Sequence, residues 1–357
     1  MKIKIILVAL FYSQLLVVSS QTLLEADGLG NTYELISSVL APGNDAVEEP
    51  DCSHLSFGRH IDEVFDVDLN KYVFRFHIHK SPDNDRCLYF DRQRNEIKTY
   101  DQSPDSLLAI EGEKVNYSWK FKLDSAFQSS ASFTHLHQIK AVGGPEASML
   151  LMTLTARKGS PDKLQLRYAD TLVQSTIHQV ELAPFKGQWV AVEETILCGE
   201  LDAGEYTILI KTIPGGDTLL IYSNDSIRTW KTGASFLRPK WGVYRSLNDS
   251  VNLRDERVLF ADIGIEELNP SFASSGSDVF LNKTILFPNP TRNKVTLSKE
   301  VLAACDRVRI YDCYGELVLN RELNSNDLNI SELKCGVYFV VFEKQGVSSA
   351  QVKIVKE

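Results

Sequence analysis

The sequence has little of several residue types, and each shortage narrows the class of protein. Only 12 prolines and 20 glycines occur among 357 residues, which excludes a collagen-like chain and a long low-complexity linker. Basic residues are in deficit, 38 against 47 acidic ones, so the formal net charge is −9. A general nucleic-acid binder would show a basic balance, so nucleic acid is not expected as a partner. A local basic groove for an acidic ligand remains compatible with this charge.

Long apolar runs are also scarce, and the longest stands at the N-terminus. Lys2 and Lys4 precede an almost wholly apolar stretch at positions 5–18, and Ser19 and Ser20 supply small residues for cleavage. This pattern predicts a secretory signal peptide over residues 1–20. The run is shorter than the ~20 residues that a membrane span needs, so no transmembrane anchor is expected.

Cysteine is sparse, and the six that occur form no CxxC pair. No zinc site, no other metal site and no required cofactor are therefore expected. An exported chain can carry disulfides, and Cys52 and Cys87, which flank a polar segment, are predicted to form one. The acidic run 83–85 could hold a structural Ca²⁺, but aspartate and asparagine are equally common in turns, and a turn is the favoured interpretation.

Residues 24–268 show short alternating runs separated by turn signals, and no long stretch has helical periodicity. Many short strands at this spacing predict an all-β jelly roll, a concanavalin-like sandwich. The expected strands are 71–79, 115–123, 132–142, 149–156, 164–168, 189–196, 206–212 and 218–222. At about 150 residues per domain, the length predicts two or three domains.

A small polar segment, 269–278, predicts a linker to a second β module over residues 279–357. This module contains FPNP at 287–290, RIYDCYGELV at 309–318 and LNISELKCGVYFV at 328–340. These motifs resemble the type A sorting domain of the type IX secretion system of Bacteroidetes. The resemblance implies export by that machinery to the medium or the cell surface of such a bacterium. The alternative is a carbohydrate-binding β-sandwich, although the segment has no tryptophan.

Three further segments carry groups suited to chemistry, and side chains alternate between faces along a strand. One face of segment 92–100 holds Arg92, Arg94, Glu96, Lys98 and Tyr100. One face of segment 238–246 holds Arg238, Lys240, Gly242, Tyr244 and Ser246, with Trp241, Val243 and Arg245 on the other. The glycine is expected to let a ligand approach the backbone.

The third segment, 133–140, separates two sets of side chains by the same alternation. Thr134, Leu136, Gln138 and Lys140 share one face, and Phe133, His135, His137 and Ile139 share the other. No third metal ligand accompanies the two histidines, so they are expected to be neutral and near the core. Together the three segments predict a groove rich in arginine and lysine on an acidic exported protein, which suits a polyanionic substrate.

The order R-x-E-x-K, Q-I-K and K-W-G-V-Y resembles the three signature strands of jelly-roll polysaccharide lyases. Over residues 26–268 the chain is similar to the ulvan lyases of polysaccharide lyase family twenty-eight, and more distantly to glucuronan lyases and heparin lyase I. The supporting stretches are 26–43, 82–101, 133–144 and 238–249. The resemblance implies a secreted, endo-acting enzyme that cleaves sulfated, uronic-acid-containing polysaccharide by β-elimination. Many alginate lyases carry histidine where this chain has Lys140, so a histidine base cannot be carried over.

Each group in the predicted groove then has a hypothetical role. Lys140 is the predicted base and Tyr244 the predicted acid, although the reverse assignment suits the same residues. Gln138 and Arg94 are predicted to stabilise charge on the substrate carboxylate. The predicted substrate contacts are Arg92, Glu96, Lys98, His137, Arg238, Lys240 and Arg245.

Three alternative functions make different demands on these residues. A glucuronan lyase or other polyuronate lyase would use the same residues, and a non-catalytic polysaccharide-binding protein would need neither Lys140 nor Tyr244. A glycoside hydrolase needs two carboxylates that flank the scissile bond. The E-x-D-x-E strand of laminarinase-like hydrolases is absent, and Glu193 and Glu194 would point to opposite faces of a strand.

Overall fold

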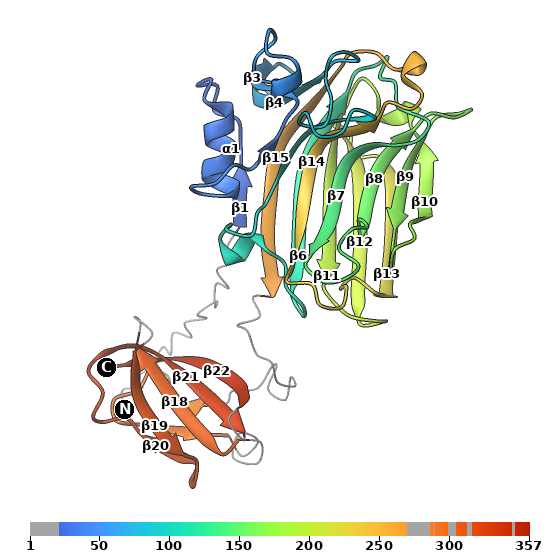
Figure 1. Ribbon diagram of the computed structural model, residues 1–357. Helices are drawn as coiled ribbons and strands as arrows, with labels where there is room; N and C mark the ends of the chain where they lie inside the picture. Colours follow the sequence, from blue (N-terminus) through green and yellow to red (C-terminus); the bar gives the residue numbers. More distant parts are fainter. Residues whose placement is uncertain (1–20, 270–285, 289, 299–304, 313–315, 345–346) are drawn as a thin grey trace, which may run out of the picture. The chain divides into compact units, whose positions relative to one another are not determined.

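The computed structural model describes residues 21–269, 286–288, 290–298, 305–312, 316–344 and 347–357. The predicted signal peptide, 1–20, and all of the predicted linker except Asn269 lie outside these residues. The chain divides into two compact units, Met1–Pro270 and Ser271–Glu357 (Figure 1). Within the described residues, no helix has the length and apolar character needed to cross a membrane.

The first unit is built from two antiparallel sheets that lie face to face (Figure 1). The larger sheet has eight strands, in the order β13-β12-β11-β6-β15-β4-β3, with β1 paired to β15. Its strands are β1 (Gln21–Leu24), β3 (Ile61–Asp66), β4 (Lys71–Ile78), β6 (Lys114–Leu123), β11 (Trp189–Leu197), β12 (Gly204–Ile213), β13 (Thr218–Ile227) and β15 (Glu256–Asn269).

The second sheet has seven strands, in the order β10-β9-β8-β7-β14-β5-β2. They are β2 (Val47–Glu48), β5 (Arg92–Lys98), β7 (Thr134–Val142), β8 (Met152–Arg157), β9 (Lys163–Tyr168), β10 (Ser175–Glu181) and β14 (Phe236–Ser246). The three segments singled out in the sequence are therefore β5, β14 and β7, which are adjacent in this order. The sheet order places their side chains on one continuous surface.

The core lies between the two sheets, and the alternation within strands explains why. In β6 the buried residues are Val115, Tyr117, Trp119, Phe121 and Leu123, and the residues between them are only partly buried. Burial of such side chains contributes about 1.5–3 kcal/mol each. The all-β jelly-roll prediction is confirmed, and each expected strand occurs with ends shifted by a few residues. The short helix α1 (Thr32–Leu40) was not predicted.

The second unit consists of two small antiparallel sheets with their own core. One has the order β16-β17-β20 and the other β19-β18-β21-β22. The strands are β16 (Leu286–Phe287), β17 (Lys294–Leu297), β18 (Arg307–Asp312), β19 (Leu317–Glu322), β20 (Asp327–Asn329), β21 (Gly336–Lys344) and β22 (Val347–Lys356). Buried Val308, Ile310, Val340, Phe342 and Ile354 are among the residues that fill this core. The predicted C-terminal β module is confirmed in fold.

Candidate active site

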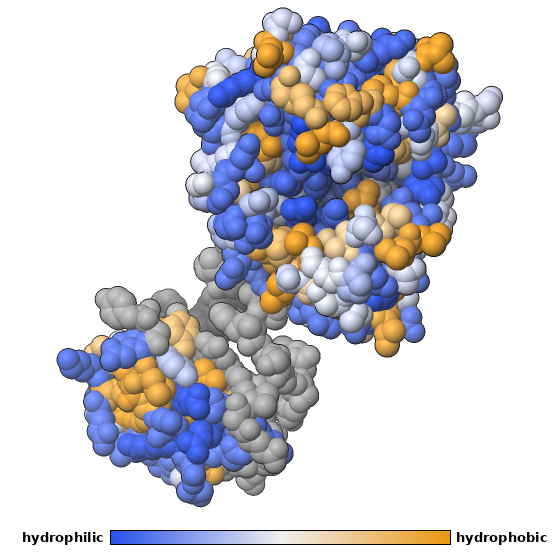
Figure 2. Space-filling model, viewed as in Figure 1, coloured by the Kyte–Doolittle hydropathy of each residue, from blue (hydrophilic) through white to orange (hydrophobic). Residues whose placement is uncertain are grey.

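The candidate site is the solvent-facing surface of the seven-stranded sheet, over β5, β14 and β7. The register places Lys240 opposite both Lys98 on β5 and Gln138 on β7. Figure 2 shows that this face of the unit is hollowed and strongly hydrophilic at its centre. We call this surface the groove. The predicted convergence of cationic, amide and phenolic groups on one face is therefore observed.

One half of the groove is a cluster of paired charges, which we call the paired half. Glu48 on β2 and Glu96 on β5 are its buried carboxylates, 5% and 0% exposed. Lys98 Nζ lies 2.9 Å from Glu48 Oε1, and Lys240 Nζ bonds to Glu48 Oε2. Arg94 bonds to Glu96, lies 3.3 Å from Glu48, and donates to Asp85 Oδ1 at 3.0 Å. The cations therefore already have protein partners.

These contacts set the proton affinities of the paired half. Burial raises the pKa of Glu48, but the charges of Lys240 and Arg94 outweigh burial and hold that pKa well below its usual range. Burial lowers the pKa of Lys240 to about 8, against the raising effect of Glu96 and Glu48. The cluster is thus a desolvated ion network rather than a set of free ligands.

Tyr244 lies at one end of this cluster and is held from two sides. The Arg94 guanidinium carbon stands 3.8 Å from the centre of the Tyr244 ring, a cation–π distance. Arg92 donates a hydrogen bond to the Tyr244 hydroxyl oxygen at 3.0 Å. Because that oxygen accepts from Arg92, its own hydrogen remains available to a substrate atom.

The other half of the groove contains cations that lack carboxylate partners, and we call it the unpaired half. Among the described residues, Lys140 and Arg238 form no ion pair and no side-chain hydrogen bond, and they lie directly opposite each other on β7 and β14. Burial lowers the pKa of Lys140, and the charges of Arg238 and Arg94 lower it further. Burial likewise lowers the pKa of Arg238.

Two further cations of the unpaired half were missed in the sequence, Arg157 on β8 and Arg167 on β9. No carboxylate of the described chain pairs with either one. Burial and the charge of Arg167 lower the pKa of Arg157, and burial lowers the pKa of Arg167. Each is a single arginine near a strand end, so no spacing pattern marked it.

His135 is a correction to the predicted face assignment. Its ring lies 5.7 Å from the Tyr244 ring and stacks on Phe133 at 4.8 Å. An irregularity in the pairing of β7 with β8 falls between His135 and His137, and one in the pairing with β14 falls between Trp241 and Tyr244. Such a β-bulge shifts alternation by one residue, so His135 shares the groove face with Gln138. Burial and the charges of Arg157 and Arg94 lower the His135 pKa to about 3.

Two predicted substrate contacts lie away from the groove. His137 is 1% exposed, sits between the sheets against Trp119 and Trp241, and has its Nε2 2.7 Å from Glu194 Oε2. Arg245 is fully buried and donates to Gln93 Oε1 at 2.7 Å. These placements correct the sequence-based assignment, because both side chains lie on the interior face of the sheet.

Gly242 also has a different role from the expected one. Its φ is +140°, and a Cβ there would lie 2.2 Å from the carbonyl oxygen of Asn95 on β5. The close approach is therefore to the neighbouring strand and not to a ligand. The glycine therefore lets β14 pack tightly against β5, in a register that stays regular through Tyr244.

Lys140 and Tyr244 are separated along the strands but face the same groove. Tyr244 is paired with His135, five positions from Lys140, and one of these positions is taken up by the bulge. At ~3.3 Å per strand residue, their backbones lie roughly 13 Å apart. Gln138 lies between them and bonds through its amide nitrogen to Glu96. The two side chains can therefore reach a ligand from opposite sides of Gln138.

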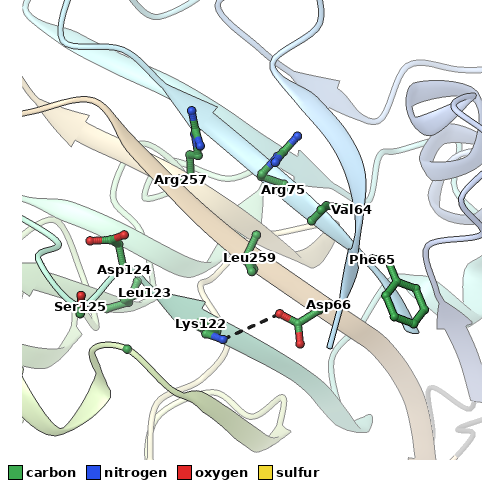
Figure 3. A pocket seen from close by; sticks show the side chains of 11 residues that line it. Val64, Phe65, Asp66, Arg75, Lys122, Leu123, Asp124, Ser125, Arg257 and Leu259 are labelled. Atoms are coloured by element: carbon green, nitrogen blue, oxygen red, sulfur yellow. Dashed lines mark ion pairs between the residues drawn. The ribbon is translucent and has the colours of Figure 1, made fainter. Parts of the chain in front are cut away.

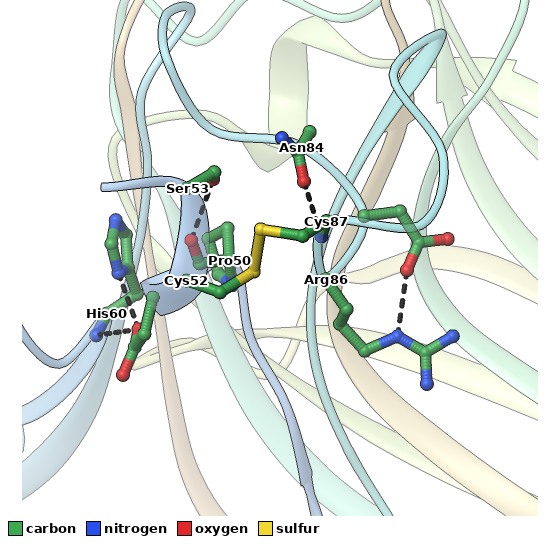
Figure 4. The surroundings of a disulfide bond; sticks show 9 residues. Pro50, Cys52, Ser53, His60, Asn84, Arg86 and Cys87 are labelled. Carbon is green, nitrogen blue, oxygen red and sulfur yellow. Dashed lines mark hydrogen bonds and ion pairs between the residues drawn. A yellow bond between two sulfur atoms is a disulfide. The ribbon is translucent and has the colours of Figure 1, made fainter. Parts of the chain in front are cut away.

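The predicted disulfide is present at the edge of this site. Cys52 and Cys87 are bonded, with their Cα atoms 6.3 Å apart (Figure 4). Asn84 accepts a hydrogen bond from the Cys87 backbone at 2.7 Å, and Asp85 pairs with Arg86 at 2.9 Å. The acidic run 83–85 therefore directs its side chains to different protein partners, as a turn does.

Two surface cavities accompany the groove, with volumes of about 440 and 430 Å³. The first lies on the eight-stranded sheet, lined by Asp66, Arg75 and Lys122 among others, with Lys122 3.8 Å from Asp66 (Figure 3). None of the predicted site residues line it. The second contains Glu48 and Lys98, so it continues the paired half of the groove.

Comparison with known proteins gives a match for the second unit. Residues 285–357 match the family model described as "Secretion system C-terminal sorting domain". This confirms the resemblance of the C-terminal module and indicates that the protein is secreted by, or displayed on, a Bacteroidetes-type bacterium. No curated protein matches the chain.

Solved structures that are similar to the chain include three polysaccharide lyases. An endo-β-1,4-glucuronan lyase from the fungus Trichoderma reesei is 15% identical, with a TM-score of 0.42, and covers 58% of this chain and 86% of its own. An alginate lyase from Aplysia kurodai is 12% identical, with a TM-score of 0.45, and covers 68% and 97%. An alginate lyase from Pseudomonas aeruginosa is 13% identical, with a TM-score of 0.39, and covers 57% and 85%.

Proposed function

We propose that the first unit is a secreted polysaccharide lyase that cleaves a uronic-acid polymer by β-elimination. The observation that carries the proposal is the unpaired half of the groove, where cations without carboxylate partners adjoin a lysine and a tyrosine suited to proton transfer. Unpaired, partly desolvated cations on an acidic protein favour a polyanionic ligand. A purely structural sheet face would pair these charges.

β-Elimination at a uronic acid has three chemical requirements. A base removes the proton at C5, donors stabilise the negative charge that develops on the carboxylate, and an acid protonates the oxygen that leaves C4. The C5–H bond and the C4–O bond break while a C4–C5 double bond forms. Stabilisation of the developing charge is usually the largest contribution.

Lys140 is assigned as the base. A free lysine has a pKa near 10.4 and is almost entirely protonated at neutral pH. Burial and the neighbouring Arg238 and Arg94 lower this pKa, which increases the neutral fraction. Lys140 Nζ forms no ion pair in the described chain, so its lone pair is not blocked by a carboxylate.

Tyr244 is assigned as the acid. Its oxygen accepts from Arg92, which leaves the hydroxyl hydrogen for the leaving oxygen and places a positive charge beside the phenolate that forms. His135 lies next to this ring with a pKa of about 3, so it is neutral at physiological pH. It can orient the substrate as a hydrogen-bonding group without adding charge.

The substrate carboxylate is assigned to Arg238 together with Gln138. Arg94 was first predicted for this role, but its guanidinium already donates hydrogen bonds to Glu96, Glu48 and Asp85. Arg238 has no such partner, and Gln138 keeps one amide hydrogen beyond its bond to Glu96. Arg94 is then a positioning residue for Tyr244.

Ulvan is the proposed substrate within this class. Ulvan carries sulfate as well as uronate, and Arg157 and Arg167 supply extra cations beyond those needed for one carboxylate. The sequence resemblance to ulvan lyases supports the same choice. Glucuronan has no sulfate, so it would meet these arginines with carboxylates alone.

The experiment is to incubate the secreted chain with ulvan, glucuronan, alginate and heparin and to follow the ultraviolet absorbance of the new C4–C5 double bond. The proposal predicts that ulvan gives the largest rate. A larger rate on glucuronan would retain the lyase and overturn the ulvan assignment. Binding without any absorbance or shortening of the polymer would show a non-catalytic protein.

A further inference from the structure

A second cluster of chemically capable side chains lies outside the groove, beside the disulfide. It consists of His54, His60, His79 and Asp83, whose potential ligand atoms all lie within 4.8 Å of one another. They come from four places in the chain: the end of the 3₁₀ turn Asp51–Ser53, the residue before β3, the residue after β4, and the following turn. The sequence alone did not indicate this cluster, because no two of its histidines share a helical or CxxC-type spacing.

The Asp83 carboxylate is the centre of the cluster. Its Oδ1 lies 2.9 Å from His54 Nδ1 and 3.3 Å from His60 Nε2, and its Oδ2 lies 3.0 Å from His79 Nδ1. A tetrahedron with metal–ligand bonds of 2.0–2.1 Å has edges of roughly 3.3 Å. The two separations that share Oδ1, 2.9 and 3.3 Å, are therefore close to the edges of a tetrahedral site.

His60 gives an independent indication of a ligand. The residue is fully buried, and its Nε2 makes no hydrogen bond of good geometry although Asp83 Oδ1 lies 3.3 Å away. Its Nδ1 lies 2.6 Å from Asp51 Oδ1 (Figure 4). A carboxylate that accepts from one ring nitrogen fixes the tautomer and leaves the lone pair of the other nitrogen free, as in carboxylate–histidine–metal arrangements. That nitrogen lies 3.3 Å from Asp83 Oδ1, and a cation between the two atoms would satisfy both groups.

We propose that His54, His60, His79 and Asp83 bind a zinc ion that holds the edge of the groove in place. Three imidazole nitrogens and one carboxylate oxygen are ligands that Zn²⁺ accepts in tetrahedral geometry. Four protein ligands close the coordination sphere, which is typical of structural rather than catalytic zinc. The proposal is independent of the proposed lyase activity and departs from the expectation that the chain holds no metal.

The surroundings connect this site to the groove. Phe57 packs on His79 and His60, at 4.3 and 4.7 Å between ring centres, and covers the cluster. On the inner side, Gln93 donates to the Asp83 carbonyl oxygen at 2.8 Å. Gln93 precedes Arg94 on β5, so an ion here would anchor the turn that carries Asp85, the partner of Arg94.

The test is the zinc content of the intact, disulfide-bonded chain after metal-free purification and titration with Zn²⁺ alone. We expect one bound zinc per chain, and a chelator should then lower the melting temperature by roughly 5–10 °C. Substitution with Co²⁺ should give the visible absorption of a four-coordinate ion. None of these measurements requires a polysaccharide substrate.

Variants of the two partly exposed ligands locate the site. H54A and H79A should each abolish stoichiometric zinc binding and the effect of the chelator, and D51N should weaken binding about 10–100-fold through His60. H178A is the matched control, because His178 lies on β10 against Tyr222, and it should bind zinc like the wild type. Absence of zinc from the folded wild type, or equal binding by H54A, H79A and H178A, would overturn the proposal.

Discussion

The two halves of the groove use the same residue types in opposite ways. In the paired half, Lys98, Lys240 and Arg94 surround two buried carboxylates. In the unpaired half, the described cations have no carboxylate within ion-pair distance. These cations are only partly buried, but burial disfavours the charged form of each one, and a polyanionic ligand would offset that cost. The comparison separates charges that pair within the fold from charges that, under the proposed function, bind the substrate.

The largest expected effect is on the two proton-transfer groups of the groove, Lys140 in the unpaired half and Tyr244 at the end of the paired half. K140M and Y244F should each reduce the rate of unsaturated-product formation by about 10²–10⁴-fold, because each removes one proton-transfer group. The initial rate on ulvan measures this. K163M and Y72F are matched controls on β9 and β4, and they should retain the wild-type rate. Near-native turnover by K140M or Y244F would remove that residue from its assigned role.

The next largest effect is on stability in the paired half. E48Q should lower the free energy of unfolding by about 3–5 kcal/mol, because Lys98 would remain buried without a counter-charge and Lys240 would keep only Glu96, 4.0 Å away. Denaturant unfolding measures this value. D91N removes the exposed partner of Arg92, 2.7 Å away, and should cost at most about 1 kcal/mol. Equal effects of the two variants would contradict the distinction between buried and exposed pairs.

Substitution of Arg238 should change how the reaction rate depends on pH. The base form of Lys140 is neutral, so the rate rises as pH increases through the Lys140 pKa. Arg238 and Arg94 lower that pKa, and Glu48 and Glu96 raise it. R238Q removes one of the charges that lower the Lys140 pKa, so the rising limb of the pH–rate profile should move to higher pH. KM should also increase about 10-fold. R238K keeps the charge and should leave the limb near its wild-type position; an unchanged limb in R238Q would show that Lys140 is not the base.

Added salt should produce the smallest effect. It should weaken substrate binding by the unpaired half and leave the stability of the paired half unchanged. Raising ionic strength from 0.1 to 1 M shortens the Debye length from about 10 to 3 Å. Attraction between the partly exposed cations and the polymer should weaken, so KM should rise several-fold. The buried pairs of Glu48 are screened much less, so the melting temperature should change little. A KM that does not depend on salt would show that the substrate is not held by these charges.

Strand alternation predicted most of the groove but failed where a strand is irregular. It placed Arg94, Glu96 and Lys98 on one face correctly, and likewise Lys240 and Tyr244, and the disulfide is also confirmed. It misplaced His135 because the bulge in β7 depends on pairing with β8 and β14, which no local pattern encodes. Glu48, Arg157 and Arg167 reach the groove from segments far apart in the sequence. Only the assembled sheet order brings them together.

The most direct test of the central claim is the mass of the products released from ulvan by the secreted chain. Elimination predicts oligosaccharides with one unsaturated uronate at the non-reducing end, each lighter by one water than the corresponding hydrolysis product, and almost none from K140M. Products that contain the added water would show hydrolysis, and a polymer of unchanged length would show binding alone. Either result would contradict the assignment of the groove as a lyase site.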